Sequence, residues 1–199
     1  MAVDVASPRP EFVAWRGNPS SELQRRTGRL ESDAVVVRWF DPGVVPGLLQ
    51  TRDYARAVLD VCVGEEGDVQ APLEQRPARQ RRWRVSDVRT HFVLSEQSLY
   101  TIVGDPETTR TQLGMLLRPL PSNSTLGILP WITQLHTAST NFVVYDHDQA
   151  VVETVIGSLR IADPVAIGDY LAVFDALTER AVQGADAHAL IRHAITTHQ

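Results

Sequence analysis

The sequence contains no lysine, and all 19 of its basic residues are arginines. Without lysine, the chain lacks the amine that Schiff-base and lysine-nucleophile chemistry requires. Cysteine is almost as scarce, because Cys62 is the only one and no intramolecular disulfide can form. Cys62 falls in an apolar helical stretch, where a small buried hydrophobe is expected rather than a nucleophile.

Long apolar runs and a basic charge balance are also missing. No apolar stretch approaches the ~18 residues that span a bilayer, and the opening MAVDVASPRPEF lacks the pattern of a signal peptide. We therefore expect a cytoplasmic protein with no membrane partner. The net charge of −5 and the pI of about 5.6 argue against the basic footprint of a nucleic-acid binder.

Motifs for metals and nucleotides are absent as well. The 12 glycines form no phosphate-binding fingerprint, and no paired Cys and His residues predict zinc. Three histidines recur every five residues, at positions His188, His193 and His198. On a helix this spacing turns each side chain by ~140° from the previous one, so the three cannot lie on one face and bind one metal ion. Asp146-His147-Asp148 fits a solvent-exposed hairpin turn better than a metal or acid–base site. We expect no metal and no cofactor.

The residues that are present predict one α+β domain. Residues 1–19 contain three prolines and read as a flexible lead, and residues 20–199 form the domain. The expected strands cover residues 35–40, 92–96, 125–129, 141–145 and 151–156. The expected helices cover residues 20–32, 51–62, 72–87 (interrupted by Pro77), 96–103, from 106 onward, 164–183 and 185–197. Their order predicts a small, mostly antiparallel sheet covered by helices.

A family resemblance rests on the run Val45-Pro46-Gly47-Leu48-Leu49-Gln50-Thr51, followed by Tyr54-Ala55-Arg56-Ala57. Later residues match the same pattern in order: Arg76, Arg79-Gln80, Leu94-Ser95-Glu96, Leu99, Gln112-Leu113, Gly127 to Pro130, Phe142, Glu153, Tyr170 and Phe174. The chain thereby resembles an actinobacterial domain of unknown function that usually forms the C-terminal part of Xre-type helix-turn-helix regulators. Pro77 departs from the expected geometry of the arginine–glutamine helix.

The resemblance implies a ligand- or partner-sensing module. Some stand-alone relatives belong to actinomycete polyketide pathways, which implies a cofactor-free cyclase acting on a polyene or macrolactone. Only 19 residues precede the domain, too few for a helix-turn-helix. We therefore expect no direct contact with nucleic acid.

Aromatic residues are the candidate lining of a pocket. Trp and Tyr combine an apolar ring with a polar group and often border ligands, although such residues more often fill a core. The candidate ligand-binding residues are Trp39, Tyr54, Trp83, Phe92, Met115, Trp131 and Phe142.

Carboxylates supply the candidate chemistry. Glu96 and Glu153 stand beside apolar strand residues, where burial would raise a carboxyl pKa and permit acid catalysis. Glu96 and Tyr100 are the candidate catalytic residues. Pairing of these carboxylates with an arginine from 76–84 is an equally good reading. The arginine cluster 76–84 itself reads as a solvated helix face rather than an anion site.

Two functions follow. The first is a cofactor-free cyclase of the pericyclase type, which holds an apolar polyene in an internal pocket and gains rate from proximity and orientation. The second is a non-catalytic sensor or antitoxin-like interaction protein. Both predict an apolar small molecule or partner, and self-association into a homo-oligomer is left open.

Overall fold

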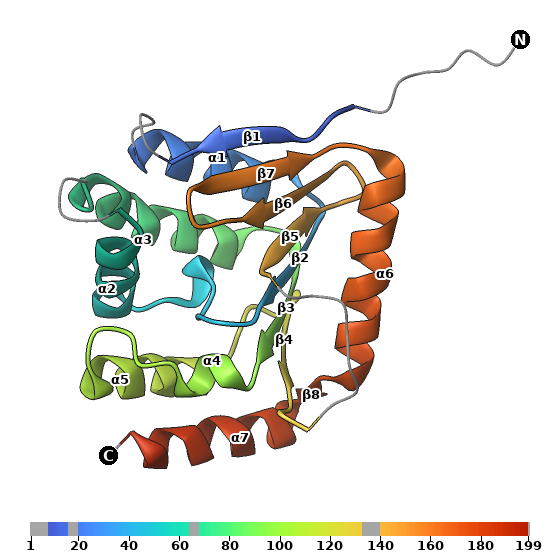
Figure 1. The fold of residues 1–199 in the computed structure, drawn as a ribbon. Helices are drawn as coiled ribbons and strands as arrows, with labels where there is room; N and C mark the ends of the chain where they lie inside the picture. The colour runs from blue at the N-terminus through green and yellow to red at the C-terminus, as the bar shows by residue number, and fades with distance from the viewer. Residues whose placement is uncertain (1–7, 16–19, 64–67, 133–139, 199) are drawn as a thin grey trace, which may run out of the picture.

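The computed structural model describes residues 8–15, 20–63, 68–132 and 140–198. Its strands form one open sheet in the order β1-β7-β6-β5-β2-β3-β4-β8 (Figure 1). The strands are β1 (Glu11–Ala14), β2 (Val36–Asp41), β3 (Arg89–Ser95), β4 (Ser124–Leu129), β5 (Phe142–Tyr145), β6 (Gln149–Glu153), β7 (Gly157–Ile161) and β8 (Val182–Gln183). The helices are α1 (Ser20–Asp33), the 3₁₀ helix η1 (Gly47–Leu49), α2 (Arg52–Val63), α3 (Gln70–Val85), α4 (Gln97–Tyr100), α5 (Pro106–Leu116), α6 (Pro164–Arg180) and α7 (Gly184–Thr197). A single α+β domain is confirmed.

The sheet is mixed, with two parallel pairs at its centre. β2 pairs in parallel with β3, and β3 in parallel with β4. Parallel neighbours need a crossover connection, and the helices α2 and α3, then α4 and α5, provide the two crossovers. All other neighbours are antiparallel, so the sheet is mostly antiparallel, as expected.

Alternating side chains of the strands build one core on each face. Trp39 points into the cluster covered by α2, α3, α4, α5 and α7, whereas its neighbour Phe40 points into the cluster covered by α6. Figure 1 shows α6 alone on its side of the sheet. It contributes Phe174 and Leu177, both buried. Because α6 begins after β7 and ends at β8, it crosses all the strands between them.

Part of the expected flexible lead belongs to the sheet. Glu11–Ala14 form β1, which pairs antiparallel with β7 over four residues. Val13 is buried, because its side chain points inward while Phe12 points outward. The close approach of the two strands requires Gly157, since a Cβ there would lie 2.4 Å from the Val13 carbonyl oxygen. The lead was expected to be flexible, and residues 11–14 of it are instead a paired strand.

Two further expectations are corrected by α2 and α3. α3 runs unbroken from Gln70 to Val85, with Pro77 inside it. Proline removes one hydrogen bond of a helix, but burial of Leu73 and Trp83 on either side holds α3 together. Cys62 is exposed rather than buried, because the inward-facing stripe of α2 ends one turn earlier, at Leu59.

Candidate functional site

At one end of three adjacent strands the apolar core gives way to polar residues, which are buried on β2, half-buried just before β5 and exposed on β6. Phe40 of β2 lies opposite Phe142 of β5, which lies opposite Val152 of β6, and all three face α6. Successive residues alternate between the faces of a sheet, so the next residue on each strand faces the opposite helical layer. Those residues are Asp41, Asn141 and Glu153.

Asn141 connects the two carboxylates of this polar row. Its Nδ2 donates a hydrogen bond to Glu153 Oε2 at 2.7 Å, and its side chain also hydrogen-bonds Asp41. Asp41 Oδ1 accepts from the backbone N–H groups of Gly43 and Val44, both at 3.0 Å. The row is therefore fixed by the strands and by the turn that follows β2.

Asp41 is poised to exchange a proton near neutral pH. Burial raises the pKa of its carboxyl from 3.8 to about 7, against the two backbone hydrogen bonds, which lower it. The negative charge of Glu153 raises the Asp41 pKa further. Perturbed carboxyl groups of this kind concentrate at functional sites.

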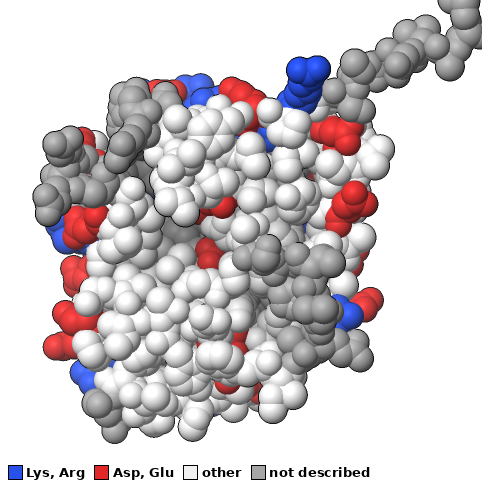
Figure 2. Space-filling model, in the orientation of Figure 1, with Lys and Arg blue, Asp and Glu red and all other residues white. Residues whose placement is uncertain are grey.

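The surface is hollowed beside the β6–β7 hairpin, whose first strand carries Glu153 at its end (Figure 2). Figure 2 shows a hollow between the β6–β7 hairpin and η1, with acidic side chains inside it and mostly neutral residues around it. Val155 and Ile156, at the turn of the hairpin, are 92% and 68% exposed. The hollow therefore combines acidic groups with an apolar border.

Three glutamines fasten the 45–51 loop beside this site. Gln50 Nε2 donates to the Val45 carbonyl at 2.6 Å, and Gln80 Nε2 donates to the carbonyl of Gln50 at 2.7 Å. Gln112 accepts from Thr51 N–H at 2.6 Å and donates to the Leu49 carbonyl at 2.9 Å. The run that carries the family resemblance is thus a loop whose backbone is fixed by its own Gln50 and by side chains of α3 and α5.

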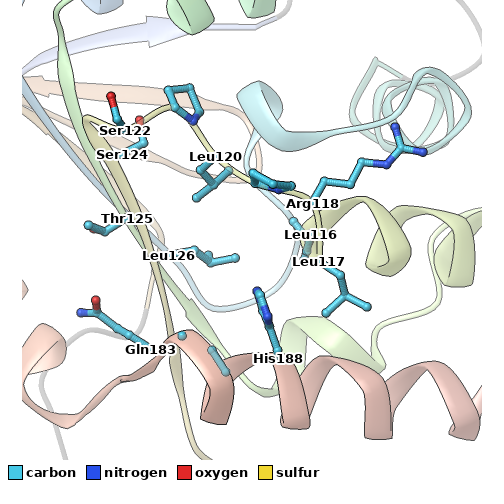
Figure 3. A pocket seen from close by; sticks show the side chains of 14 residues that line it. Leu116, Leu117, Arg118, Leu120, Ser122, Ser124, Thr125, Leu126, Gln183 and His188 are labelled. Carbon is cyan, nitrogen blue, oxygen red and sulfur yellow. The ribbon is translucent and has the colours of Figure 1, made fainter.

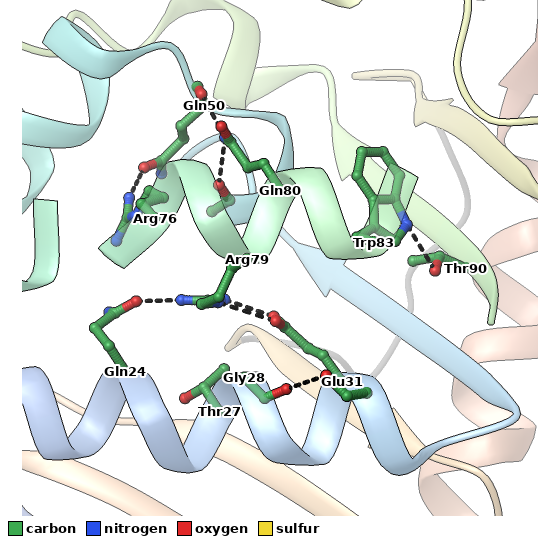
Figure 4. Close-up of polar contacts among 12 residues, drawn as sticks. Gln24, Thr27, Gly28, Glu31, Gln50, Arg76, Arg79, Gln80, Trp83 and Thr90 are labelled. Atoms are coloured by element: carbon green, nitrogen blue, oxygen red, sulfur yellow. Dashed lines mark hydrogen bonds and ion pairs between the residues drawn. The ribbon is translucent and has the colours of Figure 1, made fainter. Parts of the chain in front are cut away.

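Two buried arginines on α3 lie behind that loop (Figure 4). Arg79 forms an ion pair with Glu31 of α1, with Nη2 to Oε1 at 2.5 Å and Nε to Oε2 at 3.0 Å. Arg76 donates through Nη1 to Gln50. Both side chains are buried, so the reading of this arginine cluster as a solvated face is wrong for Arg76 and Arg79.

The predicted catalytic pair lies together with one predicted ligand-binding residue. The backbone N–H of Trp131 donates to Glu96 Oε2 at 2.8 Å. The ring centroids of Tyr100 and Trp131 are 5.9 Å apart. Glu96 is buried, whereas Trp131 is 59% exposed. The ring of His198 also lies near Tyr100, with 6.4 Å between the ring centroids. This group follows the carboxyl ends of β3 and β4.

The other predicted ligand-binding residues are distributed over both cores. Trp39 and Trp83 pack on Phe92, at centroid distances of 6.2 and 5.7 Å. Phe142 lies on the opposite face of the sheet, against Phe40 and α6.

Tyr54 and Met115 occupy separate positions on the helices. Tyr54 is buried and accepts a hydrogen bond from Val45 N–H at 3.2 Å. Met115 is half-buried on α5. The seven residues therefore do not share one site, and their role in ligand binding stays a prediction.

The sequence analysis missed Asp41 and Asn141. Asp41 directly follows the expected strand 35–40, and Asn141 was expected only to begin the strand 141–145. The available signal was a polar residue at the end of each of several apolar strands. It becomes informative only when the strand order and register are known.

A second concavity borders the start of β4 (Figure 3). Its volume is about 410 Å³, and leucines of the α5–β4 connection line it together with His188 of α7. Volumes of this order suit small molecules. None of the predicted site residues lines it, and the polar row lies elsewhere.

The described part of the chain offers neither a group of metal ligands nor a helix that could cross a membrane. Within it, no three His, Cys, Asp or Glu residues are grouped to hold a metal ion. No helix there combines the length and the apolar character that crossing a bilayer requires.

Comparisons with known proteins identify the family. No curated protein matches the sequence. Two solved structures are similar: the archaeal chromatin protein TrmBL2, with a TM-score of 0.46 and 12% identity, and NucT from Helicobacter pylori, with 0.49 and 11%. The matches cover 89% and 88% of this chain, and 53% and 99% of the other chains, so this chain spans about half of TrmBL2. The model of one family matches residues 24–193, and the chain therefore belongs to the family described as domain of unknown function DUF5753.

Proposed function

We propose that this domain binds a small molecule in the hollow at the carboxyl ends of β2 and β6, where Asp41 exchanges a hydrogen bond or a proton with it. The observation that carries the proposal is the polar row of Asp41, Asn141 and Glu153, which continues a sheet face formed in part by Trp39, Val143 and Val151. Open sheets with parallel strands tend to bind ligands outside the carboxyl ends of those strands.

The surroundings of the polar row support a ligand of mixed character. The carboxyl groups and Asn141 offer hydrogen bonds, and the exposed Val155 and Ile156 offer apolar contact. Because the pKa of Asp41 is about 7, both its protonated and its ionised form are present at neutral pH. The ligand is therefore a mostly apolar molecule with at least one polar group.

The cyclase is the catalytic form of this proposal. A polyene or macrolactone would be held against the apolar border, while Asp41 donates a hydrogen bond or proton to a carbonyl oxygen. The support is the resemblance to stand-alone polyketide cyclases and the absence of any need for a cofactor in such chemistry. In this form the protein works in the cytoplasm.

The sensor is the non-catalytic form, supported by the resemblance to the C-terminal part of Xre-type regulators. Ligand binding would then change the stability or contacts of the domain without turnover. The 45–51 loop is hydrogen-bonded to side chains of α2, α3 and α5. It would connect a ligand in the hollow to this helical layer.

The test measures binding and turnover with the same proteins. Linear polyene esters and macrocyclic polyenes are titrated into wild type, Asp41→Asn and the control Asp175→Asn, whose carboxylate is exposed on α6. We expect saturable chemical-shift changes and a raised melting temperature for wild type and Asp175→Asn, both weakened at least tenfold in affinity for Asp41→Asn.

Product analysis then separates the two forms. Formation of a cyclised product by wild type, lost in Asp41→Asn, supports the cyclase, whereas binding without product supports the sensor. Equal binding by wild type and a folded Asp41→Asn variant would show that the site lies elsewhere, and the groove beside β4 would be tested next.

A further inference from the structure

Arg76 is a buried cation without an anionic partner. Its side chain is 7% exposed, and no carboxylate of the described residues lies within ion-pair distance of it. Nη1 donates to the neutral amide oxygen of Gln50. Nε is buried and has no hydrogen-bond partner in the described part of the protein.

The neighbouring Arg79 shows what a satisfied arginine looks like in the same helix. Arg79 makes two hydrogen bonds to Glu31 and a third to Gln24. That carboxylate is therefore already engaged. An isolated buried charge is costly unless it is paired, so the environment of Arg76 is incomplete as it stands.

The electrostatic surroundings of Arg76 agree with this reading. Burial and, to a smaller extent, the positive charge of Arg79 lower the pKa of Arg76 from 12.5 to about 10. The negative groups that act in the opposite direction are Glu31, Glu153 and, when ionised, Cys62. The Cys62 thiol is exposed and, like an ordinary thiol, mostly neutral near pH 7, so Arg76 has no compensation from that side.

The position of Arg76 connects it with the polar row. It interacts electrostatically with Glu153, which forms one end of that row, and with the exposed Cys62. η1 lies directly over the guanidinium, because a Cβ on Gly47 would lie 3.8 Å from Arg76 Cζ. The guanidinium thus lies beneath the 45–51 loop and within electrostatic range of one end of the polar row.

We propose that Arg76 binds an oxyanion of the ligand, so that the natural ligand is a mostly apolar acid whose carboxylate or phosphate pairs with the guanidinium. This inference rests on the proposed function and adds the chemical class of the ligand. Arginine suits the role, because its planar group donates two parallel hydrogen bonds to carboxylate or phosphate oxygens.

The experiment compares oxyanions with chloride at equal ionic strength. Sodium acetate, sodium phosphate and sodium chloride are titrated into wild type, Arg76→Gln and the control Arg56→Gln. Arg56 is an exposed arginine on α2 that contacts Gln70. We expect acetate or phosphate to raise the melting temperature of wild type and Arg56→Gln in a saturable manner, because a ligand that binds only the native state stabilises it.

Arg76→Gln should lose this saturable response and keep only the gradual rise that excluded salts give to any protein. The relative size of the acetate and phosphate responses identifies the oxyanion. Equal responses of wild type and Arg76→Gln would overturn the inference.

A second measurement does not need the variant to fold. In wild type labelled with ¹⁵N-arginine, the Nε–H resonance of Arg76, assigned through its backbone, should shift saturably with acetate or phosphate but not with chloride. No shift with either oxyanion overturns the inference.

The outcome is distinguishable from failure of the proposed function. If Asp41→Asn abolishes binding of polyene esters while Arg76 shows no oxyanion response, the inference fails and the site stands. If polyene acids bind more tightly than their esters to wild type but not to Arg76→Gln, both stand.

Discussion

Arg76 and Arg79 lie nearly one turn apart on α3 but have opposite electrostatic environments. Burial alone would lower the pKa of Arg79, but the charge and hydrogen bonds of Glu31 raise it above the ordinary value. No carboxylate does the same for Arg76. Arg79 therefore stabilises the contact between α1 and α3, whereas Arg76 has no carboxylate within ion-pair distance in the described part of the chain.

Removing the partner of Arg79 should strongly destabilise the fold. Glu31→Gln leaves a buried guanidinium uncompensated, and breaking a buried ion pair in this way costs about 3–5 kcal/mol. Urea denaturation measures the free energy of unfolding. The matched control is Glu22→Gln on the same helix, where the pair with Arg25 is exposed and worth about 0–1 kcal/mol. Similar losses for both variants would mean that Arg79 does not depend on Glu31.

Asp41 makes stability depend on pH in a defined direction. Because its folded pKa of about 7 lies above the ordinary 3.8, the folded protein binds this proton more tightly than the unfolded chain. The free energy of unfolding therefore falls as pH rises from about 4 to about 7 and stays low above that range. Asp41→Asn keeps the acceptor for Gly43 and Val44 but removes the titration.

The stability advantage of Asp41→Asn over wild type should grow by about 2 kcal/mol between pH 5 and pH 8. Denaturation curves at the two pH values measure it, with Asp175→Asn as the exposed control. A constant difference between wild type and Asp41→Asn would contradict the raised pKa.

For single residues, the sequence indicates which side chains could be functional but not which other side chains they contact in the fold. Glu96, Tyr100 and Trp131 were each selected from local context, and the structure brings them together at the ends of β3 and β4. The polar row could not be predicted, because Asp41 and Asn141 are 100 positions apart and meet only through the pairing of β2 with β5.

The strands that the sequence did not predict are short and lie at or next to the edges of the sheet. β1 has four residues and β8 only two, too few for a periodic pattern. β7, with the sequence GSLRI, mixes polar and apolar residues without alternation. The helical pattern around Leu177 continues past Arg180, so the predicted helix 164–183 included residues that form β8. Longer and more regular elements, such as α5 and β2, were predicted nearly in full.

The pairing of β1 with β7 depends on the missing side chain of Gly157. Gly157→Ala places a methyl group 2.4 Å from the Val13 carbonyl oxygen, which forces β1 away from the sheet. We expect faster amide hydrogen exchange in residues 11–14 and a loss of about 1–3 kcal/mol of stability. Gly168→Ala on α6 is the control, because nothing lies within 4 Å of its added Cβ. It should stabilise by about 0.5–1 kcal/mol. Unchanged exchange in β1 of Gly157→Ala would refute this.

For the whole molecule, the α+β fold class could be predicted from the order of helices and strands along the chain. The order of the strands within the sheet could not. Helices alternating with strands and a late run of strands indicate α+β. The order of strands depends on where the chain crosses the sheet, as between β4 and β5, and local periodicity carries no such information.

The two cores should unfold together, because they share the same strands. Leu177 is completely buried against the α6 face, whereas Trp39 and Trp83 belong to the other core. Leu177→Ala should cost about 2–5 kcal/mol and shift the tryptophan fluorescence and circular dichroism transitions by the same amount. Val165→Ala, exposed on α6, is the control. A fluorescence transition that stays at the wild-type midpoint would indicate two independent units.

The path of α6 over one face of the sheet has a consequence for inheritance. A gene fragment that ended before this helix would encode a sheet with one apolar face exposed to solvent. A fragment that began after β7 would encode the helix without the strands on which it packs. Selection should therefore remove recombinants that separate α6 from the strands it covers. Related sequences should vary in their loops but inherit these strands and α6 together.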